Sequence, residues 1–253
     1  MGQKVYQTFE EAVRDVPHGA SILIPGFGPG VPLNLLRALY HQGAKNLTLI
    51  ANGAGGPATP GREDTITSGT LVEAGRVRKV ILAFTGATHP SRRSVLEELQ
   101  ETGKIEAELT PQGSLAERIR AGGAGIPAFY TPAGVGTEIA NGKEHRVFNG
   151  RTYILEEAIT ADYAFIRAWK ADTFGNLIFR RAQRNFNPIM ATAARCTIVE
   201  VEEPITSEGE LDPDQVHTPG IFVHRIVKIP PPPFEALRAS PASAAPAHGP
   251  APR

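Results

Sequence analysis

Cysteine is almost absent from this sequence, since Cys196 is the only one in 253 residues. A single thiol excludes an internal disulfide and any metal site built from several cysteines. Because Cys196 enters an apolar run, we expect a small buried residue, and a reactive thiol is the less favoured alternative. The seven histidines include no pair four residues apart and none beside the cysteine, so we predict no metal site.

Net charge and long apolar runs are also missing. The 26 Lys and Arg residues balance the 26 Asp and Glu residues, so no global field attracts nucleic acid or anionic lipid. No stretch approaches the ~20 apolar residues of a membrane span. The N-terminus lacks the apolar region of a signal peptide. We therefore expect a cytoplasmic protein that binds neither nucleic acid nor membrane.

Glycine, in contrast, is concentrated in residues 21–32, which read Ser-Ile-Leu-Ile-Pro-Gly-Phe-Gly-Pro-Gly-Val-Pro. The apolar start is typical of a buried parallel strand, and Pro32 precedes a helical pattern of leucines. The stretch therefore predicts a strand, a glycine loop and a helix N-terminus. Such a loop brings bare backbone close to a ligand and directs free N–H groups at negative charge. A tight turn without a ligand is an equally open interpretation, and the spacing fits no dinucleotide or Walker motif.

Strand and helix patterns alternate along the first half of the chain. Strands are predicted at 21–24, 47–50, 80–84 and 105–109, and helices at 8–16, 32–43, 91–101 and 114–123. The last helix is expected to begin with a capping box, Ser114 to Glu117. This alternation predicts an α/β fold with an open, mostly parallel sheet and helices on both faces.

The second half is richer in strand signals, at 152–155, 163–169, 177–179, 197–201 and 221–229. No clean linker divides the two halves, so we expect one domain over residues 1–229. Eight of the 22 prolines fall in the last 24 residues. Residues 230–253 therefore form a Pro/Ala-rich tail, which we expect to be disordered and dispensable for stability.

Amide side chains follow two of the predicted strands. Asn52 and Gln112 each come directly after a strand and are flanked by glycine. Carboxyl ends of parallel strands share one edge of a sheet, where ligands bind. Neutral amides donate to a carboxylate or a thioester carbonyl without titrating, which suits oxyanion stabilisation. From spacing alone, a role limited to satisfying turns is equally open.

The charged residues of the sequence give less support for a functional role than the two amides do. Glu156 and Glu157 follow a predicted strand and could be functional carboxylates, but adjacent residues point to opposite faces. Three basic residues could bind an anion, although a solvated face is the commoner explanation: Lys170, Arg180 and Arg181. Two histidines that flank a predicted strand are expected to be structural or surface groups: His217 and His224.

Longer motifs carry a resemblance to the first (A) subunit of family I coenzyme A transferases. Residues 26–32 resemble a Gly-Gly-Phe…Gly-x-Pro signature of that family, with Pro25 in place of its first glycine. Residues 109–127, Leu-Thr-Pro-Gln-Gly-Ser-Leu-Ala-Glu-Arg-Ile-Arg-Ala-Gly-Gly-Ala-Gly-Ile-Pro, are a second match. Shorter matches lie at 142–145, 170–172, 175–178, 184–188, 209–213 and 218–221. The resemblance covers residues 5–229 and is greatest to succinyl-CoA:3-oxoacid and 3-oxoadipate enzymes.

The resemblance implies an enzyme that exchanges CoA between an acyl-CoA thioester and a free carboxylate. In this family a glutamate attacks the thioester, forming an acyl-glutamyl anhydride and then a glutamyl-CoA thioester. In two-subunit members that glutamate belongs to a B subunit. The resemblance thus implies a B-subunit partner in an α2β2 assembly, succinyl-CoA as donor and a 3-oxoacid such as acetoacetate as acceptor. Coenzyme A is then a cosubstrate, and no cofactor is bound permanently.

The resemblance also assigns site residues. Gln112 corresponds to the substrate-contacting glutamine and would stabilise the oxyanion. Asn52 corresponds to the first residue of an Asn-Asn pair, whose second amide is replaced by Gly53. The glycine loop would surround the acyl group through Gly26, Phe27, Gly28 and Gly30. The missing amide affects the identity of the substrate more than the reaction class.

Three alternatives stay open at this point. The first is the A subunit of a 3-oxoadipate CoA-transferase. The second is a non-catalytic small-molecule sensor, because the fold also resembles sugar-phosphate isomerases and the effector domains of some repressors. A sensor of that kind would carry a helix-turn-helix, for which the chain has no pattern outside the core. The third is a degenerate subunit that only scaffolds a partner.

Overall fold

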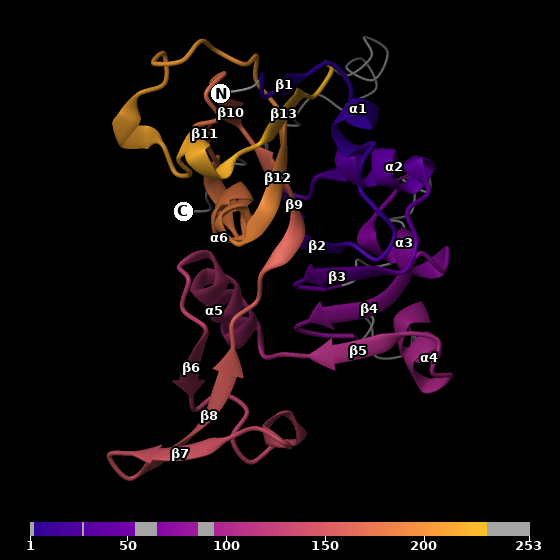
Figure 1. Ribbon diagram of the computed structural model, residues 1–253, viewed down its shortest axis with the longest axis vertical. Helices are drawn as coiled ribbons and strands as arrows, with labels where there is room; N and C mark the ends of the chain where they lie inside the picture. Colours follow the sequence, from indigo (N-terminus) through magenta and orange to yellow (C-terminus); the bar gives the residue numbers. More distant parts are fainter. Residues whose placement is uncertain (1–2, 27, 54–64, 86–93, 232–253) are drawn as a thin grey trace, which may run out of the picture.

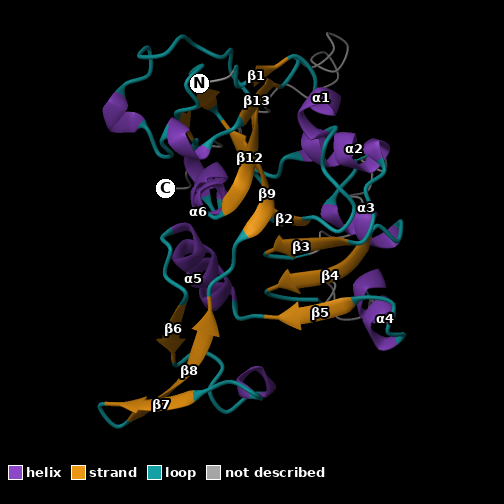
Figure 2. Ribbon diagram, viewed as in Figure 1, coloured by secondary structure: helices purple, strands orange, loops and turns teal. Residues whose placement is uncertain are grey.

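An eight-stranded sheet in which all paired strands run parallel forms the centre of the protein (Figures 1 and 2). The computed structural model describes residues 3–26, 28–53, 65–85 and 94–231. Across the sheet the order is β1 (Val5–Tyr6), β13 (Arg225–Lys228), β12 (Ala194–Val201), β9 (Ala161–Ala168), β2 (Ser21–Ile24), β3 (Leu47–Ala51), β4 (Val77–Leu82) and β5 (Glu106–Leu109). The predicted parallel sheet is confirmed.

Helices cover both faces of this sheet, as predicted. One face carries α1 (Phe9–Val13), α2 (Leu33–Gln42), α3 (Ser68–Glu73) and α4 (Val95–Glu101), and the other carries α5 (Gln112–Gly123) and α6 (Asn187–Thr192). Side chains alternate between the two cores along each strand. In β2, Ile22 and Ile24 pack with α2, whereas Leu23 packs in the core beneath α5 and α6. A strand buried on both faces reads as a continuous apolar run, which is why β2 and β3 were predictable.

The strand-rich second half also forms smaller sheets. A three-stranded antiparallel sheet of β6 (Ala128–Thr131), β8 (Arg151–Glu157) and β7 (His145–Phe148) extends beyond the end of the main sheet below α5 (Figure 2). Two short antiparallel strands, β10 (Lys170–Ala171) and β11 (Leu177–Ile178), pair beside β9. The 3-10 helices are η1 (Glu138–Ala140), η2 (Arg181–Arg184), η3 (Pro213–Gln215) and η4 (Gly220–Phe222).

Several predicted boundaries were wrong. Strand β4 begins three residues before the predicted start, at Val77, which pairs with Leu47 of β3. The polar Lys79 interrupts the apolar run, and its Nζ lies 2.7 Å from Glu106 and 3.2 Å from Glu108 on the neighbouring strand. The predicted strand over 221–229 begins only at Arg225, and η4 precedes it. Helix α2, in contrast, ends at Gly43 as predicted, with a left-handed φ of 93° that favours glycine.

Helix α5 starts two residues earlier than the capping box indicated. Pro111 is its N-cap, and no side chain caps the helix. The hydroxyl of Ser114, expected to cap, is instead buried without a hydrogen-bond partner among the described residues. Proline favours a helix start because its backbone nitrogen has no hydrogen to leave unpaired. Gln112 is therefore the first residue of the helix.

Two further expectations concern exposure. Cys196 is half-buried on β12, and burial raises the pKa of its thiol, so it packs as a small apolar residue. Nearly all of the predicted tail, residues 230–253, lies outside the described residues. Within the described part of the chain, no helix is both long enough and apolar enough to cross a bilayer.

Candidate active site

The carboxyl ends of β2, β3, β4 and β5 lie at one edge of the sheet (Figure 1), and candidate residues follow β2, β3 and β5 there. The loops after β2 and β3 touch. A Cβ atom on Gly26 would lie 3.2 Å from the Cβ of Asn52 and 3.2 Å from the backbone N of Gly53. Contacts this close leave little room for a side chain at position 26. The glycine loop and the Asn52 turn therefore lie against each other at this edge.

Asn52 is only 2% exposed at this edge. Its backbone O accepts from the N–H of Ala83 at 3.0 Å, which fixes the turn to the end of β4. Its side-chain Oδ1, however, has no hydrogen-bond partner within the described residues. Buried polar atoms in proteins are nearly always paired, so this oxygen calls for a donor from outside the described residues.

Gln112 follows β5, two strands away from β3. Strands spaced by ~4.8 Å place the two chain ends roughly 10 Å apart. The amide of Gln112 is exposed, and the first backbone bond of the helix runs from the N–H of Leu115 to the O of Pro111 at 2.8 Å. A cavity of about 470 Å³ adjoins this helix start and is lined by Pro111, Gly113, Ser114, Glu117, Phe129, Tyr130, Thr131 and Ala133. Both amides thus lie at the same edge, with space beside Gln112.

Arg118 holds helix α5 in this position. Its Nη1 donates to Glu108 Oε1 at 2.7 Å and to Thr110 Oγ1 at 3.1 Å, and its Nε donates to the backbone O of Glu157 at 2.7 Å. One guanidinium therefore ties α5 to β5 and to β8. The sequence does not single out Arg118, because its partners are far apart in the chain.

Two asparagines that the sequence analysis placed only in a motif hold the glycine loop. Gly30 has φ of 94°, and a Cβ there would lie 2.8 Å from Nδ2 of Asn187. This Nδ2 donates to the backbone O of Gly30 at 3.3 Å, and Nδ2 of Asn185 donates to the O of Pro29 at 2.9 Å. The matched segment 184–188 thus supports the loop from the chain's second half. Gly30 makes room for this support.

The N-terminus of α2 already has a hydrogen-bond acceptor from the protein itself. Glu200 on β12 is fully buried, and its Oε2 accepts from the backbone N–H groups of Asn34 at 3.0 Å and Leu35 at 3.1 Å. Burial raises the pKa of Glu200 to about 7, although Arg167, with Nη1 at 3.5 Å, and these N–H groups act in the opposite direction. The sequence left open whether N–H groups in this segment face a ligand, and those of Asn34 and Leu35 do not need one. They are satisfied by the protein's own carboxylate.

Other carboxylates near α5 are paired as well. Glu156 lies within β8, not after it, and is 1% exposed; Lys143 Nζ is 2.6 Å from its Oε1. Burial raises the pKa of Glu108, but its bonds to Arg118 and Lys79 outweigh this and leave the pKa lowered. Glu117 pairs with Arg120 at 2.6 Å. None of these three is an unpaired nucleophile.

Most of the remaining candidate residues make contacts that support the fold, and one lies outside the described residues. Phe27 is outside the described residues, and Gly28 is exposed with nothing within 4 Å of a Cβ. Two of the basic candidates pack on the Trp169 ring: Lys170 and Arg180. The histidines are structural, as expected, since each Nδ1 accepts a backbone N–H: His217 from Phe179 and His224 from Thr197.

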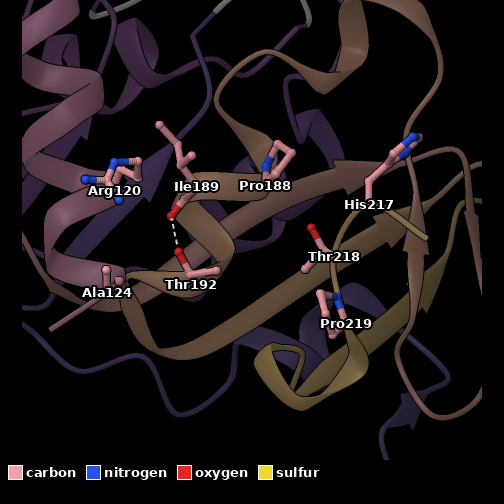
Figure 3. A pocket seen from close by; sticks show the side chains of 9 residues that line it. Arg120, Ala124, Pro188, Ile189, Thr192, His217, Thr218 and Pro219 are labelled. Carbon is pink, nitrogen blue, oxygen red and sulfur yellow. Dashed lines mark hydrogen bonds between the residues drawn. The ribbon is translucent and has the colours of Figure 1, made fainter. Parts of the chain in front are cut away.

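A second cavity lies away from this edge. It measures about 280 Å³ and lies between α5, α6 and residues 217–219 (Figure 3). Thr192, which lines it, donates to the backbone O of Ile189 at 2.8 Å. None of the predicted substrate-binding residues lines this cavity.

Comparisons with known proteins agree with this geometry. Residues 6–229 match the family model "Coenzyme A transferase". The chain is 48% identical over 225 residues to the A subunit of a probable succinyl-CoA:3-ketoacid coenzyme A transferase of Bacillus subtilis, covering 88% of this chain and 89% of that protein. It is 45% identical over 230 residues to the A subunit of a 3-oxoadipate CoA-transferase of Pseudomonas putida, covering 90% and 95%.

Solved structures are similar in fold. Glutaconate coenzyme A-transferase from Acidaminococcus fermentans matches with a TM-score of 0.74 at 24% identity, over 90% of this chain and 76% of that chain. An acyl-CoA transferase from E. coli O157:H7 matches with a TM-score of 0.73 at 24% identity. The match covers 90% of this chain and 47% of that chain, so this chain spans about half the length of the E. coli enzyme. On the family match and the near relatives together, the chain belongs to the coenzyme A transferase family.

Proposed function

We propose that this chain is the A subunit of a transferase that moves CoA from an acyl-CoA, with succinyl-CoA as the donor, to a 3-oxoacid such as acetoacetate. The names of two relatives, which are A subunits of succinyl-CoA:3-ketoacid transferases, support these substrates and a B-subunit partner. We further propose an α2β2 assembly in the cytoplasm. Residues 1–229 would form one domain, with 230–253 as a tail.

The observation that carries the proposal is the neutral character of the candidate site. Its edge offers a buried amide at Asn52, an exposed amide at Gln112 and the glycine backbone at Gly26. These groups can donate to a developing oxyanion, but they cannot form an anhydride. The carboxylates of Glu108, Glu117 and Glu156 are all held in ion pairs.

In the proposed reaction, a glutamate carboxylate on the B subunit first attacks the thioester carbonyl carbon. The C–S bond breaks, CoA leaves as a thiolate, and an acyl-glutamyl anhydride forms. The thiolate then attacks the glutamyl carbonyl and releases the first carboxylate, and the 3-oxoacid carboxylate repeats these steps in reverse order. The Gln112 amide would donate to the oxyanion of each tetrahedral intermediate. Asn52 and the glycine loop would orient the acyl group, through Gly26, Phe27, Gly28, Gly30 and Gly53.

A second acceptor is supported by one relative. The 45% identity to a 3-oxoadipate transferase is close to the 48% identity to a succinyl-CoA:3-ketoacid transferase. Identity therefore does not separate the two acceptors. The sensor and scaffold alternatives have no support of this kind, because both named relatives belong to enzymes.

The proposal is tested by purifying the chain alone and together with a B subunit encoded beside it. Each preparation is incubated with succinyl-CoA and acetoacetate, and any glutamyl-CoA adduct is trapped with borohydride or hydroxylamine. We expect turnover only with the B subunit, with the adduct mapped to that partner, because removing a covalent nucleophile leaves only a small residual rate. Robust turnover by the isolated chain, or an adduct on its Glu156 or Glu157, would contradict the two-subunit assignment.

A further inference from the structure

The aromatic ring of Phe84 packs closely against Gly53. Gly53 forms an isolated parallel bridge with Phe84, just beyond the ends of β3 and β4. A Cβ on Gly53 would lie 2.8 Å from Cζ and 3.1 Å from Cε2 of the Phe84 ring. Among the described glycines, Gly53 is not one with a positive φ, so its backbone is open to any residue. The ring would therefore have to move for a side chain to fit at position 53.

The same ring lies at the edge where the substrate would bind. Phe84 follows β4, the strand between β3 and β5, so it is placed between Asn52 and Gln112. Its side chain is 47% exposed, whereas the neighbouring Asn52 is 2% exposed. A large exposed apolar side chain beside a buried amide is the combination that small-molecule sites use, with an apolar wall and few polar anchors.

We propose that Phe84 is a specificity-determining residue whose ring gives the acyl site an apolar wall beside Asn52. The inference rests on the proposed function and names its substrate class. A ring offers contact area but no hydrogen bond, so it favours an acyl chain with additional methylene groups at that point. The preferred acceptor is then a 3-oxoacid longer and more apolar than acetoacetate, such as 3-oxohexanoate.

The expected size of the preference, as a ratio of kcat/KM values, follows from how apolar sites discriminate between substrates. One extra methylene buried against an apolar wall changes kcat/KM by about 10–200-fold. The ring also offers no hydrogen bond to a polar substrate end. Both effects act in the same direction, toward apolar acyl chains. Dicarboxylic acceptors such as 3-oxoadipate should be disfavoured.

The geometric part can be tested without any activity. Gly53→Ala is introduced into the wild-type A–B complex and into a Phe84→Ala complex. Because the added methyl must displace the ring, we expect a fall in melting temperature of about 2–4 °C in the wild-type background. In the Phe84→Ala background the space is free, and the fall should disappear. Equal falls in both backgrounds would show that the ring does not occupy this space.

The specificity part is tested by measuring kcat/KM of the A–B complex with acetoacetate, 3-oxohexanoate and 3-oxoadipate. We expect the wild type to prefer 3-oxohexanoate, and Phe84→Ala to reduce its preference over acetoacetate by about tenfold or more. The matched control is Phe148→Ala, because Phe148 is 40% exposed but lies on β7 in the projecting sheet. That control should keep the wild-type preference.

The outcomes separate this inference from the proposed function. A complex that transfers CoA with the same preference in wild type and Phe84→Ala would overturn the role of Phe84 and leave the proposed function intact. A wild-type preference for acetoacetate or 3-oxoadipate would overturn the substrate class. A complex that transfers CoA to none of the three acceptors would overturn the proposed function itself.

Discussion

The two halves of the parallel sheet differ in how completely their polar groups are paired. In the half formed by β9, β12 and β13, Glu200 accepts from the start of α2, Arg167 binds Glu202, and Asn187 accepts the Arg167 N–H and donates to Gly30. In the half formed by β2 to β5, the carboxyl edge carries glycine loops, an exposed Phe84 and an Asn52 oxygen that has no partner among the described residues.

This difference indicates that one half of the sheet supports the fold and the other half carries the candidate site. A fully connected polar network makes the chain around it rigid, whereas a buried group without a partner is costly unless a ligand completes it. Two residues of the paired half bind segments that follow β2. Glu200 accepts a hydrogen bond from the start of α2, and Asn187 donates one to the glycine loop. Changes in the unpaired half should therefore alter activity, and changes in the paired half should alter stability first.

Gln112→Ala is the strongest test of the unpaired half. Removing an oxyanion donor lowers turnover by about 10²–10³-fold, or about 3–4 kcal/mol. Because the Gln112 side chain is exposed, the melting temperature should change little. The measurement is kcat of the A–B complex together with a thermal melt.

Two results would count against the role of Gln112. One is a loss of turnover below about tenfold with assembly intact. The other is an equal loss in the matched variant Gln215→Ala, whose amide is exposed in η3 and binds Asp212 at 3.0 Å.

Glu200→Ala is the corresponding test of the paired half. It removes the acceptor for two N–H groups at the start of α2, and unpaired buried groups cost about 1–3 kcal/mol each. We expect a loss of stability of a few kcal/mol, measured by denaturant unfolding. A loss confined to kcat, with unfolding unchanged, would contradict the division between the two halves.

Glu200→Gln is the control for Glu200→Ala, and it also tests how stability depends on pH. The folded pKa of Glu200, about 7, lies above its ordinary value of 4.5, so the folded protein binds this proton more tightly than the unfolded chain. The stability of the wild type should therefore fall as the pH rises from about 4.5 to about 7. Glu200→Gln cannot titrate and should lack this part of the slope. An identical slope in both proteins would show that Glu200 does not titrate in this range.

Asn185→Ala should have the smallest effect, because it acts where the two halves meet. Its Nδ2 donates to the O of Pro29 at 2.9 Å from a partly exposed position, and a bond of this kind contributes about 0.5–1.5 kcal/mol. The melting temperature should fall by a few degrees. We expect KM for the acyl-CoA to rise while kcat stays close to wild type, since the loop binds and does not react. A fall in kcat with unchanged KM would contradict this.

Local patterns predicted the strands and helices whose cause is local. The apolar run of β2, the αL glycine after α2 and the strand-end position of Asn52 all follow from adjacent residues. The predicted start of α5 was wrong because the sequence contains two helix-start signals close together, Pro111 and the capping box that begins at Ser114. The helix begins directly after Pro111. Exposed Ile221 extended the prediction for β13, although it lies in the preceding 3-10 helix.

The site was predictable in its outline and not in its contacts. Asn52, Gln112 and the glycine loop could be placed at one edge, since parallel strands end together. The pairs that complete the site are distant in sequence: Phe84 with Gly53, Asn187 with Gly30 and Glu200 with Leu35. No local pattern encodes such pairs, so neither the contact of Phe84 with Gly53 nor the internal acceptor at α2 could be inferred.

The position of β13 has a consequence for how the chain folds. Strand β13 lies between β12 and β1, with Ile226 paired to Val5, so strands about 220 residues apart are neighbours. Lys4 adds to this closure by donating to the backbone O of Phe174 and Gly220. Contacts this distant in sequence slow folding, because the loop must close before they are gained. During synthesis β1 has no strand partner until β13, which ends at Lys228, has been made. Its edge stays unpaired for most of translation, and unpaired strand edges promote aggregation.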